Sequence, residues 1–504
     1  MKKNVLLLLA VLSYLTVAIV SCNGSEPVPE PDQNNPEQLD SLEQNQEPAD
    51  SVDQGEKEPV ELQKLTMTFE ESDQDRIFER KPKFNLRLEN PNDTVVTASI
   101  TIKLFTDKGV SVKVLENNVD VPAKGTENAE ITTDEDLAPG FYKIHCSVKT
   151  PMKKIPFTVA SFNFGVAPEQ IVSAPDMQPD FESYWDAAKN MLPKIKEGET
   201  VTLQEIELKS GSRKVYLVEL QSVPNGLTGD PVIVRGFYVE PQDGQKHPVL
   251  MHFFGWDDRN GSVTVPSGGS SEYAEFYLST RGQYHNNRPA AYEKTEQWIA
   301  EHGEWKAADP CKYASILDAS DEYNWFGFNF GDKDSFYYRG AFLDCVQAIR
   351  FMATRPTSDM TNLFAEGSSQ GGALSYAAAA LSDFPFTAIA ANVAFLGDYP
   401  DYFDIVSWPG NVAKDNQGSM TDEQMYAFLS YYDTKNLATL IPATCAVLAS
   451  SGLQDGTCPP HTNFAAYNNL KTKDKEMVIG PKMQHSYPDG WSSKMNNFFR
   501  HRMK

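Results

Sequence analysis

The sequence lacks the basic stretches of nucleic-acid-binding proteins and the paired cysteines of zinc proteins. It contains no stretch rich in lysine and arginine, and 69 acidic residues outnumber 45 basic ones, so the formal net charge is -24. A chain without a basic face has nothing to hold a row of phosphates, which excludes nucleic-acid binding. Only six cysteines occur and none forms a CxxC pair, so no zinc site is expected. One or two disulfides remain possible in an exported chain, but the spacing does not say which cysteines pair.

The first 22 residues are typical of exported proteins. Two lysines follow the initial methionine, VLLLLAVLSYLTVAIV is apolar, and Ser21-Cys22 leads into a polar stretch. This arrangement resembles a bacterial lipoprotein signal, with a signal peptide over residues 1–21 and a lipid attached to Cys22. A plain transmembrane anchor is the alternative. We expect an outer membrane lipoprotein that faces either the cell surface or the periplasm.

Residues 22–60 are predicted to be a disordered acidic tether. From Asn23 to Pro59 the chain has 11 acidic residues, one lysine and no aromatic residue. Such a segment cannot bury enough apolar surface to fold. Its acidity also resembles the signals that send lipoproteins to the cell surface.

Residues 61–166 are predicted to form a small all-β domain. LTMTFE, FNLRLE, TVVTASITIKLFT, VSVKVLE, AEITT and FYKIHCSV are short alternating runs, and turn sequences such as NPND, DKG and APG separate them. An immunoglobulin-like sandwich is the simplest fold for this pattern. The domain carries no chemical motif, so a spacer, a glycan-contacting module and an oligomer contact all remain open as its role.

Residues 167–504 show strand-like runs that alternate with helical ones. This order predicts α/β architecture with a mainly parallel sheet. The first strands are joined by hairpin-like connections, so that end of the sheet is expected to be antiparallel. The loop-rich segment over 257–336 is expected to carry a lid or an insertion that shapes the substrate site.

The strongest chemical motif is FAEGSSQGGALSYAAAALS, at positions 364–382. It places Gly367-Ser368-Ser369-Gln370-Gly371 between an apolar strand and a small-residue helix, which is the context of a nucleophile elbow. Ser369 is therefore the predicted nucleophile. A glycine-rich turn without catalysis is the alternative, and Ser368 and Ser375 are rival serines that do not occupy the centre of the motif.

A nucleophilic serine needs a base and an orienting acid, which in this context follow it in the chain. Asp455 comes after the apolar run ATCAVLAS, and His485 follows the short run EMVIG. His461 is expected at the start of a helix and His501 on the solvent side of the last helix, so His485 is the predicted base. A loop acid at Asp455 and a solvated histidine at His485 are the alternatives.

The predicted oxyanion hole consists of two backbone N–H groups. One belongs to Gln370, directly after the nucleophile, and the other to Phe254, after the run HPVLMHF.

Several segments together resemble the acetyl xylan esterase and cephalosporin C deacetylase family, carbohydrate esterase family seven. They are HFFGWDD, Arg281-Gly-Gln283, YYRGAFLDCVQAIRFMATRP, GSSQGG and GLQDGTCPPHTNFAAYN. The resemblance runs from about residue 180 to the C-terminus. It implies an α/β-hydrolase that removes acetyl groups from sugars with Ser369, His485 and Asp455, without a metal or an organic cofactor. It also implies that Arg281 and Gln283 support active-site loops.

The sequence departs from this family at three positions and in the loop from Trp256 to Tyr284, and two other functions remain open. Phe254 stands where tyrosine is usual. Tyr284 stands where glycine is usual, and Ser486 where glutamate is usual, which affects the expected substrate range more than the triad. A serine peptidase of the same fold and a non-catalytic glycan-binding lipoprotein are the rival functions. The resemblance also implies ring-shaped homo-oligomers. The extra β-domain and the lipid tether argue against such an assembly for this chain. The expected partners are an acetylated oligosaccharide, such as a xylo-oligosaccharide, and the membrane.

Overall fold

The computed structural model describes residues 62–504, apart from positions 72, 134, 207–212, 225, 227–228, 230, 257–262, 267–271, 282–284 and 290–324. Cys22, the predicted signal peptide, the acidic tether and Gln283 lie outside the described residues, as does much of the predicted lid segment. None of the helices in the described ranges is long and apolar enough to cross a membrane.

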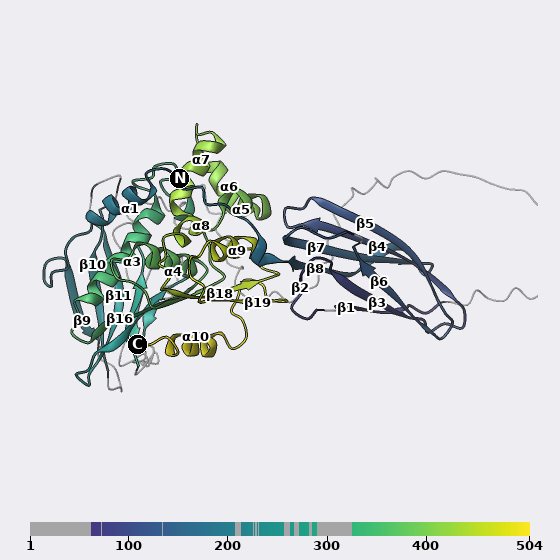
Figure 1. The fold of residues 1–504 in the computed structure, drawn as a ribbon, viewed down its shortest axis with the longest axis horizontal. Coiled ribbons are helices and arrows are strands. Elements are labelled where there is room, and N and C mark those ends of the chain that lie inside the picture. Colours follow the sequence, from purple (N-terminus) through teal and green to yellow (C-terminus); the bar gives the residue numbers. More distant parts are fainter. Residues whose placement is uncertain are drawn as a thin grey trace, which may run out of the picture. The chain divides into compact units, whose positions relative to one another are not determined.

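A nine-stranded sheet organises the C-terminal part of the chain (Figure 1), in the order β19-β18-β17-β16-β12-β14-β11-β10-β9. Its strands are β9 (Val201–Ile206), β10 (Arg213–Gln221), β11 (Ile233–Pro241), β12 (His247–Phe253), β14 (Ala274–Ser279), β16 (Ser358–Ser368), β17 (Ala388–Asn392), β18 (Ala446–Gly452) and β19 (Lys475–Gly480). The pairs from β9 to β14 are antiparallel, and those from β14 through β12 to β19 are parallel. The mainly parallel sheet with an antiparallel end is confirmed. A short pair, β13 (Val263–Val265) and β15 (His285–Pro289), forms a separate sheet.

Helices cover both faces of this sheet. They are α1 (Phe181–Asn190), α3 (Tyr337–Ala353), α4 (Gln370–Leu381), α5 (Tyr399–Ile405), α6 (Ser407–Asn416), α7 (Asp422–Leu429), α8 (Thr434–Ala438), α9 (Pro460–Asn468) and α10 (Trp491–Arg500). Because successive strand residues point to opposite faces, Ala365 of β16 joins the core with α1, α3 and α4, whereas Phe364 packs on Phe499 of α10. α10 lies on the opposite face of the sheet from α3 and α4 (Figure 1).

The preceding all-β region consists of two sheets that share one core. One contains β1 (Thr66–Glu71), β3 (Lys83–Glu89) and β6 (Thr126–Thr132), and the other β2 (Ile77–Phe78), β8 (Lys153–Val166), β7 (Gly140–Thr150), β4 (Val96–Thr106) and β5 (Ser111–Val121). Strand β8 was not among the runs predicted from sequence. Pro156 and the two lysines at its start interrupt the alternation that marks a strand.

Four cysteines of the described chain are buried free thiols: Cys146, Cys345, Cys445 and Cys458. No disulfide therefore joins any two of these four. Burial raises the pKa of each thiol, to about 11 for Cys146 and to about 12 for Cys445. Cys311 lies outside the described residues.

Candidate active site

Ser369 lies at the turn between β16 and α4, in an unusual backbone conformation. Its φ of 58° and ψ of -119° are strained for a residue with a side chain. Two backbone hydrogen bonds hold the turn: the Ser369 N–H donates to the carbonyl of Asn392 at 2.9 Å, and the Phe395 N–H donates to the carbonyl of Ser369 at 3.0 Å. The strain is therefore fixed by neighbouring structure, as the elbow predicted from sequence requires.

The glycines on either side of Ser369 are needed because the backbone passes so closely there. A Cβ on Gly367 would lie 2.3 Å from the carbonyl oxygen of Gly371, and a Cβ on Gly371 would lie 2.2 Å from that of Phe253. Real Cβ atoms do not approach carbonyl oxygens this closely. The sequence motif is thus explained by the crowding of β12, β16 and α4 at one point.

Asp455 and His485 lie together in the loops after β18 and β19. The Nδ1 atom of His485 is 2.8 Å from Oδ2 of Asp455, whose side chain is fully buried while that of His485 is 30% exposed. The other oxygen of Asp455 accepts hydrogen bonds from the backbone N–H groups of Thr457 at 2.8 Å and Cys458 at 2.9 Å. These bonds fix the carboxylate, which in turn orients the imidazole.

Ser369 and His485 line one cavity of about 560 Å³. Its other walls are aromatic or small: Gly255, Trp256, Phe395, Trp408 and Thr457. Trp256 and Trp408 meet edge to face, with ring centroids 6.3 Å apart. The cavity has the size and the largely apolar lining of a small-molecule site.

The two residues predicted to supply oxyanion donors flank the serine. Gln370 is the first residue of α4, where backbone N–H groups have no partner within the helix. Phe254 follows β12, whose Phe253 pairs with Gly367 in the parallel register. The next residue is Gly255. A Cβ placed on Gly255 would lie 3.5 Å from the carbonyl oxygen of Ser368, so this loop runs beside the elbow.

Arg281 is buried against Asp344 of α3. Its Nη2 lies 2.6 Å from one carboxylate oxygen of Asp344, and its Nε donates to the other at 3.0 Å. Neither side chain is more than 3% exposed. Gly340 gives this guanidinium its space, since a Cβ there would lie 2.2 Å from Arg281. Arg281 therefore braces the segment after β14 against α3, and Asp344, a lone acid inside an apolar helix, is a partner that the sequence analysis did not identify.

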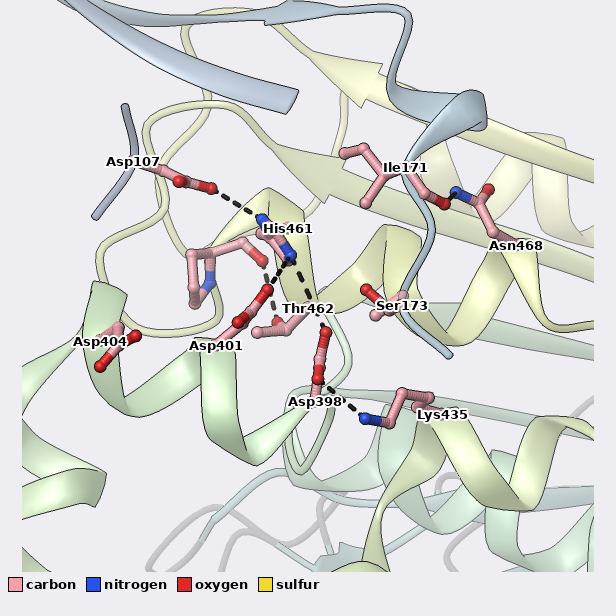
Figure 2. Close-up of polar contacts among 12 residues, drawn as sticks. Asp107, Ile171, Ser173, Asp398, Asp401, Asp404, Lys435, His461, Thr462 and Asn468 are labelled. Carbon is pink, nitrogen blue, oxygen red and sulfur yellow. Dashed lines mark hydrogen bonds and ion pairs between the residues drawn. The ribbon is translucent and has the colours of Figure 1, made fainter. Parts of the chain in front are cut away.

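A second polar cluster surrounds His461 at the start of α9, three residues after Cys458 (Figure 2). The Nδ1 atom of His461 lies 2.8 Å from Asp107, in the loop after β4, and its Nε2 lies 2.9 Å from Asp401 and 3.8 Å from Asp398. Lys108 pairs with Asp401, and Lys435 pairs with Asp398.

The charges of this cluster decide the state of His461. Ligand atoms of Asp398, Asp401 and His461 lie within 4.8 Å of one another, close enough to surround a cation. A protonated imidazole, Lys108 and Lys435 face these carboxylates, and the two lysines also pair with Asp404 and Asp176, so carboxylates outnumber cations in the cluster. Burial opposes that proton, but Asp107 and Asp401 outweigh it and raise the pKa of His461 to about 9. The imidazolium therefore supplies positive charge between Asp107 and Asp401.

The structure brings together Ser369, His485, Asp455, Gln370 and Phe254, and Arg281 contacts Asp344 of α3 instead of these residues. His461 is separate from this group and starts a helix, as expected, and His501 is exposed at the end of α10. The amides of Thr457 and Cys458 were not predicted from sequence, because no motif indicates which backbone groups donate to Asp455.

Comparison with known proteins identifies the family of this chain. A profile of the acetyl xylan esterase family matches residues 170–502. The chain is 27% identical over 337 residues to the acetyl esterase Axe7A of Xylanibacter ruminicola, covering 66% of this chain and 68% of that protein.

Two solved structures resemble the fold. An acetyl xylan esterase from Paenibacillus sp. R4 superposes with a TM-score of 0.52 at 25% identity, covering 66% of this chain and 98% of that one. Acetyl xylan esterase 1 from Thermoanaerobacterium sp. JW/SL YS485 gives a TM-score of 0.51 at 22% identity, covering 67% and 98%. The α/β-hydrolase fold predicted from sequence is confirmed. The chain belongs to the acetyl xylan esterase family and is a carboxylic ester hydrolase.

Proposed function

We propose that the protein is a serine esterase that removes acetyl groups from acetylated sugars, such as xylo-oligosaccharides, through Ser369, His485 and Asp455. The observation that carries the proposal is the pairing of two features in one cavity: a serine on a strained turn, and a histidine oriented by a buried carboxylate. The relatives that match are acetyl esterases by name, which supports acetate as the acyl group.

In the proposed reaction, His485 takes the proton of Ser369 as the serine Oγ attacks the ester carbonyl. The oxyanion of the tetrahedral intermediate accepts hydrogen bonds from the backbone N–H groups of Gln370 and Phe254. The sugar hydroxyl leaves with the proton held by His485, and an acetyl-enzyme remains. Water then repeats the sequence and releases acetate. Asp455 holds the imidazole throughout, because one of its oxygens is bonded to His485 and the other accepts hydrogen bonds from two backbone amides.

The aromatic walls suit a sugar as the alcohol component. The apolar face of a pyranose ring packs on an indole ring because both apolar surfaces are then removed from water. Trp408 is 36% exposed at the mouth of the cavity, and its ring stacks on Phe395 with centroids 5.5 Å apart. The indole of Trp408 is therefore held in place by Phe395 and accessible, so a sugar ring can stack on it.

The test is acetate release from acetylated xylo-oligosaccharides by the full-length chain in detergent, beside Ser369→Ala. Removal of a triad nucleophile costs on the order of a million-fold in kcat. Ser375→Ala is the matched control, because this rival serine lies on the same helix and its hydroxyl bonds only to the Gly371 carbonyl in the described structure. Loss of activity in Ser375→Ala but not in Ser369→Ala would disprove the assignment of Ser369 as the nucleophile. Inactivity of the wild type on both sugar acetates and aryl acetates would favour a peptidase or a binding protein.

We also propose that Cys22 carries a lipid and that residues 22–60 tether the enzyme at the outer membrane. The apolar run before Ser21-Cys22 and the acidic, aromatic-free stretch after it support this proposal. Cys22→Ser should move the protein from the membrane fraction to the soluble fraction and abolish incorporation of labelled fatty acid. External protease added to intact cells separates the two orientations, because only a surface-facing enzyme is degraded. An enzyme that stays in the membrane fraction after Cys22→Ser would point to a plain transmembrane anchor instead.

A further inference from the structure

A second cavity, of about 780 Å³, lies between the β-sandwich and the catalytic domain. One wall comes from the sandwich strands β4, β7 and β8, with Lys103, Phe105, Lys143, His145, Ser161 and Asn163. The other wall comes from the junction of α5 and α6 and from the loop that contains Asp455 and Gly456. Its volume is within the range of protein sites that bind small molecules.

This cavity is lined by residues that are next in the chain to residues of the catalytic cavity. Ser407 lines the sandwich cavity and Trp408, the next residue, lines the cavity of Ser369. In the same way, Gly456 lines the first and Thr457 the second. Neighbouring residues therefore line the two cavities at two places, and these places mark the path by which a chain longer than the catalytic cavity would reach the sandwich cavity.

Specific contacts fix the sandwich wall in place. The side chain of Asn163 donates to the carbonyl of Leu453 at 2.9 Å, and its backbone N–H donates to the side chain of Gln454 at 2.9 Å. Gln454 donates back to the Asn163 carbonyl, also at 2.9 Å. At the other end of the contact, Asp107 holds His461, as Figure 2 shows. The cavity is thus bounded by two surfaces that are bonded to each other.

The sandwich wall is positively charged in a strongly acidic protein. Lys103 of β4 is directly opposite His145 of β7, and Phe105 is opposite Lys143. Both lysines are exposed, and no carboxylate of the described residues forms an ion pair with either. The two carboxylates that line the cavity are already engaged, Asp107 with His461 and Asp455 with His485. Cations that face a cavity without a partner, in a chain of net charge -24, indicate an anionic ligand.

We propose that this cavity binds a glycan chain that carries uronic-acid substituents, as an extension of the substrate site. The inference rests on the proposed function, because the bound chain is the one whose acetyl groups react at Ser369. Lys103 and Lys143 hold the carboxylate of the uronate, Phe105 packs against a sugar ring, and Ser161 bonds to hydroxyls. The sandwich thereby makes the enzyme prefer acidic, branched glycan chains over neutral ones.

The first experiment measures kinetics with three acetylated substrates: an aryl acetate, a neutral xylo-oligosaccharide, and a xylo-oligosaccharide bearing a glucuronate. Lys103→Glu and Lys143→Glu are compared with Lys149→Glu, which makes the same charge change on the same face of β7 outside the cavity. Each cavity variant should raise KM for the glucuronate substrate about 3- to 10-fold, with kcat unchanged, because the contact is equal in ground and transition states. Aryl acetate and neutral substrate should change less than about 2-fold, and 0.5 M salt should remove the difference by screening.

The second experiment separates this inference from the esterase assignment. Ser369→Ala protein is titrated with non-acetylated xylotetraose and with the same oligosaccharide carrying one glucuronate, so that no catalysis is involved. Tighter binding of the glucuronate form, lost in the Lys103→Glu/Lys143→Glu background and kept with Lys149→Glu, supports the proposal even if the acetyl substrate is another one. Equal binding of the two oligosaccharides, or an equal loss with Lys149→Glu, overturns it.

Discussion

The ion pairs of His461 make the stability of the protein depend on pH in a defined direction. The pKa of this histidine is about 9 in the folded protein, against about 6.5 in an unfolded chain. A group whose pKa is raised by folding contributes stability that is complete below its unfolded pKa and is lost as the pH rises through its folded pKa. The stabilisation by His461 should therefore be complete below about pH 6.5 and absent above about pH 9.

The size of the effect follows from the shift. Each pKa unit corresponds to 1.36 kcal/mol, so a rise from about 6.5 to about 9 corresponds to about 3 kcal/mol between pH 6 and pH 10. The side chain of His461 is only 11% exposed, so solvent screens these pairs little. On the acid side, the pairs with His461 lower the pKa of Asp401, although burial opposes them. That contribution is lost only in strong acid, so neutral pH is the stable range.

The assay is denaturant unfolding at pH 6 and at pH 10, on the wild type and on His461→Gln. His252 also has a pKa raised to about 9 by Glu275 and Glu366 against the effect of burial, so the wild type alone would report two histidines. The variant removes one of them. We expect the wild type to lose about 3 kcal/mol more than His461→Gln over this range.

The outcome that refutes the reasoning is an equal loss in the two proteins. An ion at the cluster would give a different result, since a metal-bound imidazole is neutral and its site is strengthened as the pH rises. In that case the wild type would gain stability relative to His461→Gln at pH 10, and a chelator would lower its melting temperature. We expect a chelator to change neither melting temperature nor activity.

Three further substitutions test the catalytic domain. Asp455→Asn should reduce kcat by on the order of 10⁴-fold with the fold intact, because the imidazole loses its orienting charge; a loss below 10-fold would contradict its role. Gly371→Ala should lower the melting temperature and the yield, since its Cβ would lie 2.2 Å from a strand carbonyl; an unchanged melting temperature would show that the elbow is less crowded. Asp344→Asn should cost about 3 kcal/mol in denaturant unfolding, because the buried Arg281 loses its carboxylate partner, whereas Asp383→Asn, at an exposed arginine pair, should cost less than about 1 kcal/mol.

The catalytic domain could be predicted largely from sequence because its chemistry imposes local rules. A serine between glycines, after an apolar run and before a small-residue helix, satisfies a steric condition that few other structures impose, and the crowding at Gly367 and Gly371 is that condition. His485 and Asp455 could be selected because each follows a strand in the required chain order.

Contacts between distant segments could not be predicted in this way. Asp107 and His461 are separated by 354 positions, and nothing near either residue indicates the other. Asp344 is similar, because a lone acid in an apolar helix is recognised as buried only when its partner is known. Pairings of this kind depend on the tertiary fold, whereas the elbow depends on a few consecutive residues.

The sandwich domain is the case in which this difference matters most for function. From sequence it has no chemical motif, and its outward residues look like an ordinary solvent-exposed face. In the structure, Asn163 of β8 bonds to Leu453 and Gln454, directly before the proposed catalytic acid. The same face places Lys103 and Lys143 along a cavity whose other wall includes chain neighbours of residues that line the cavity of Ser369. A domain without catalytic residues therefore restrains the loop of Asp455, and under the proposal made above it would also select which glycan chains reach the serine.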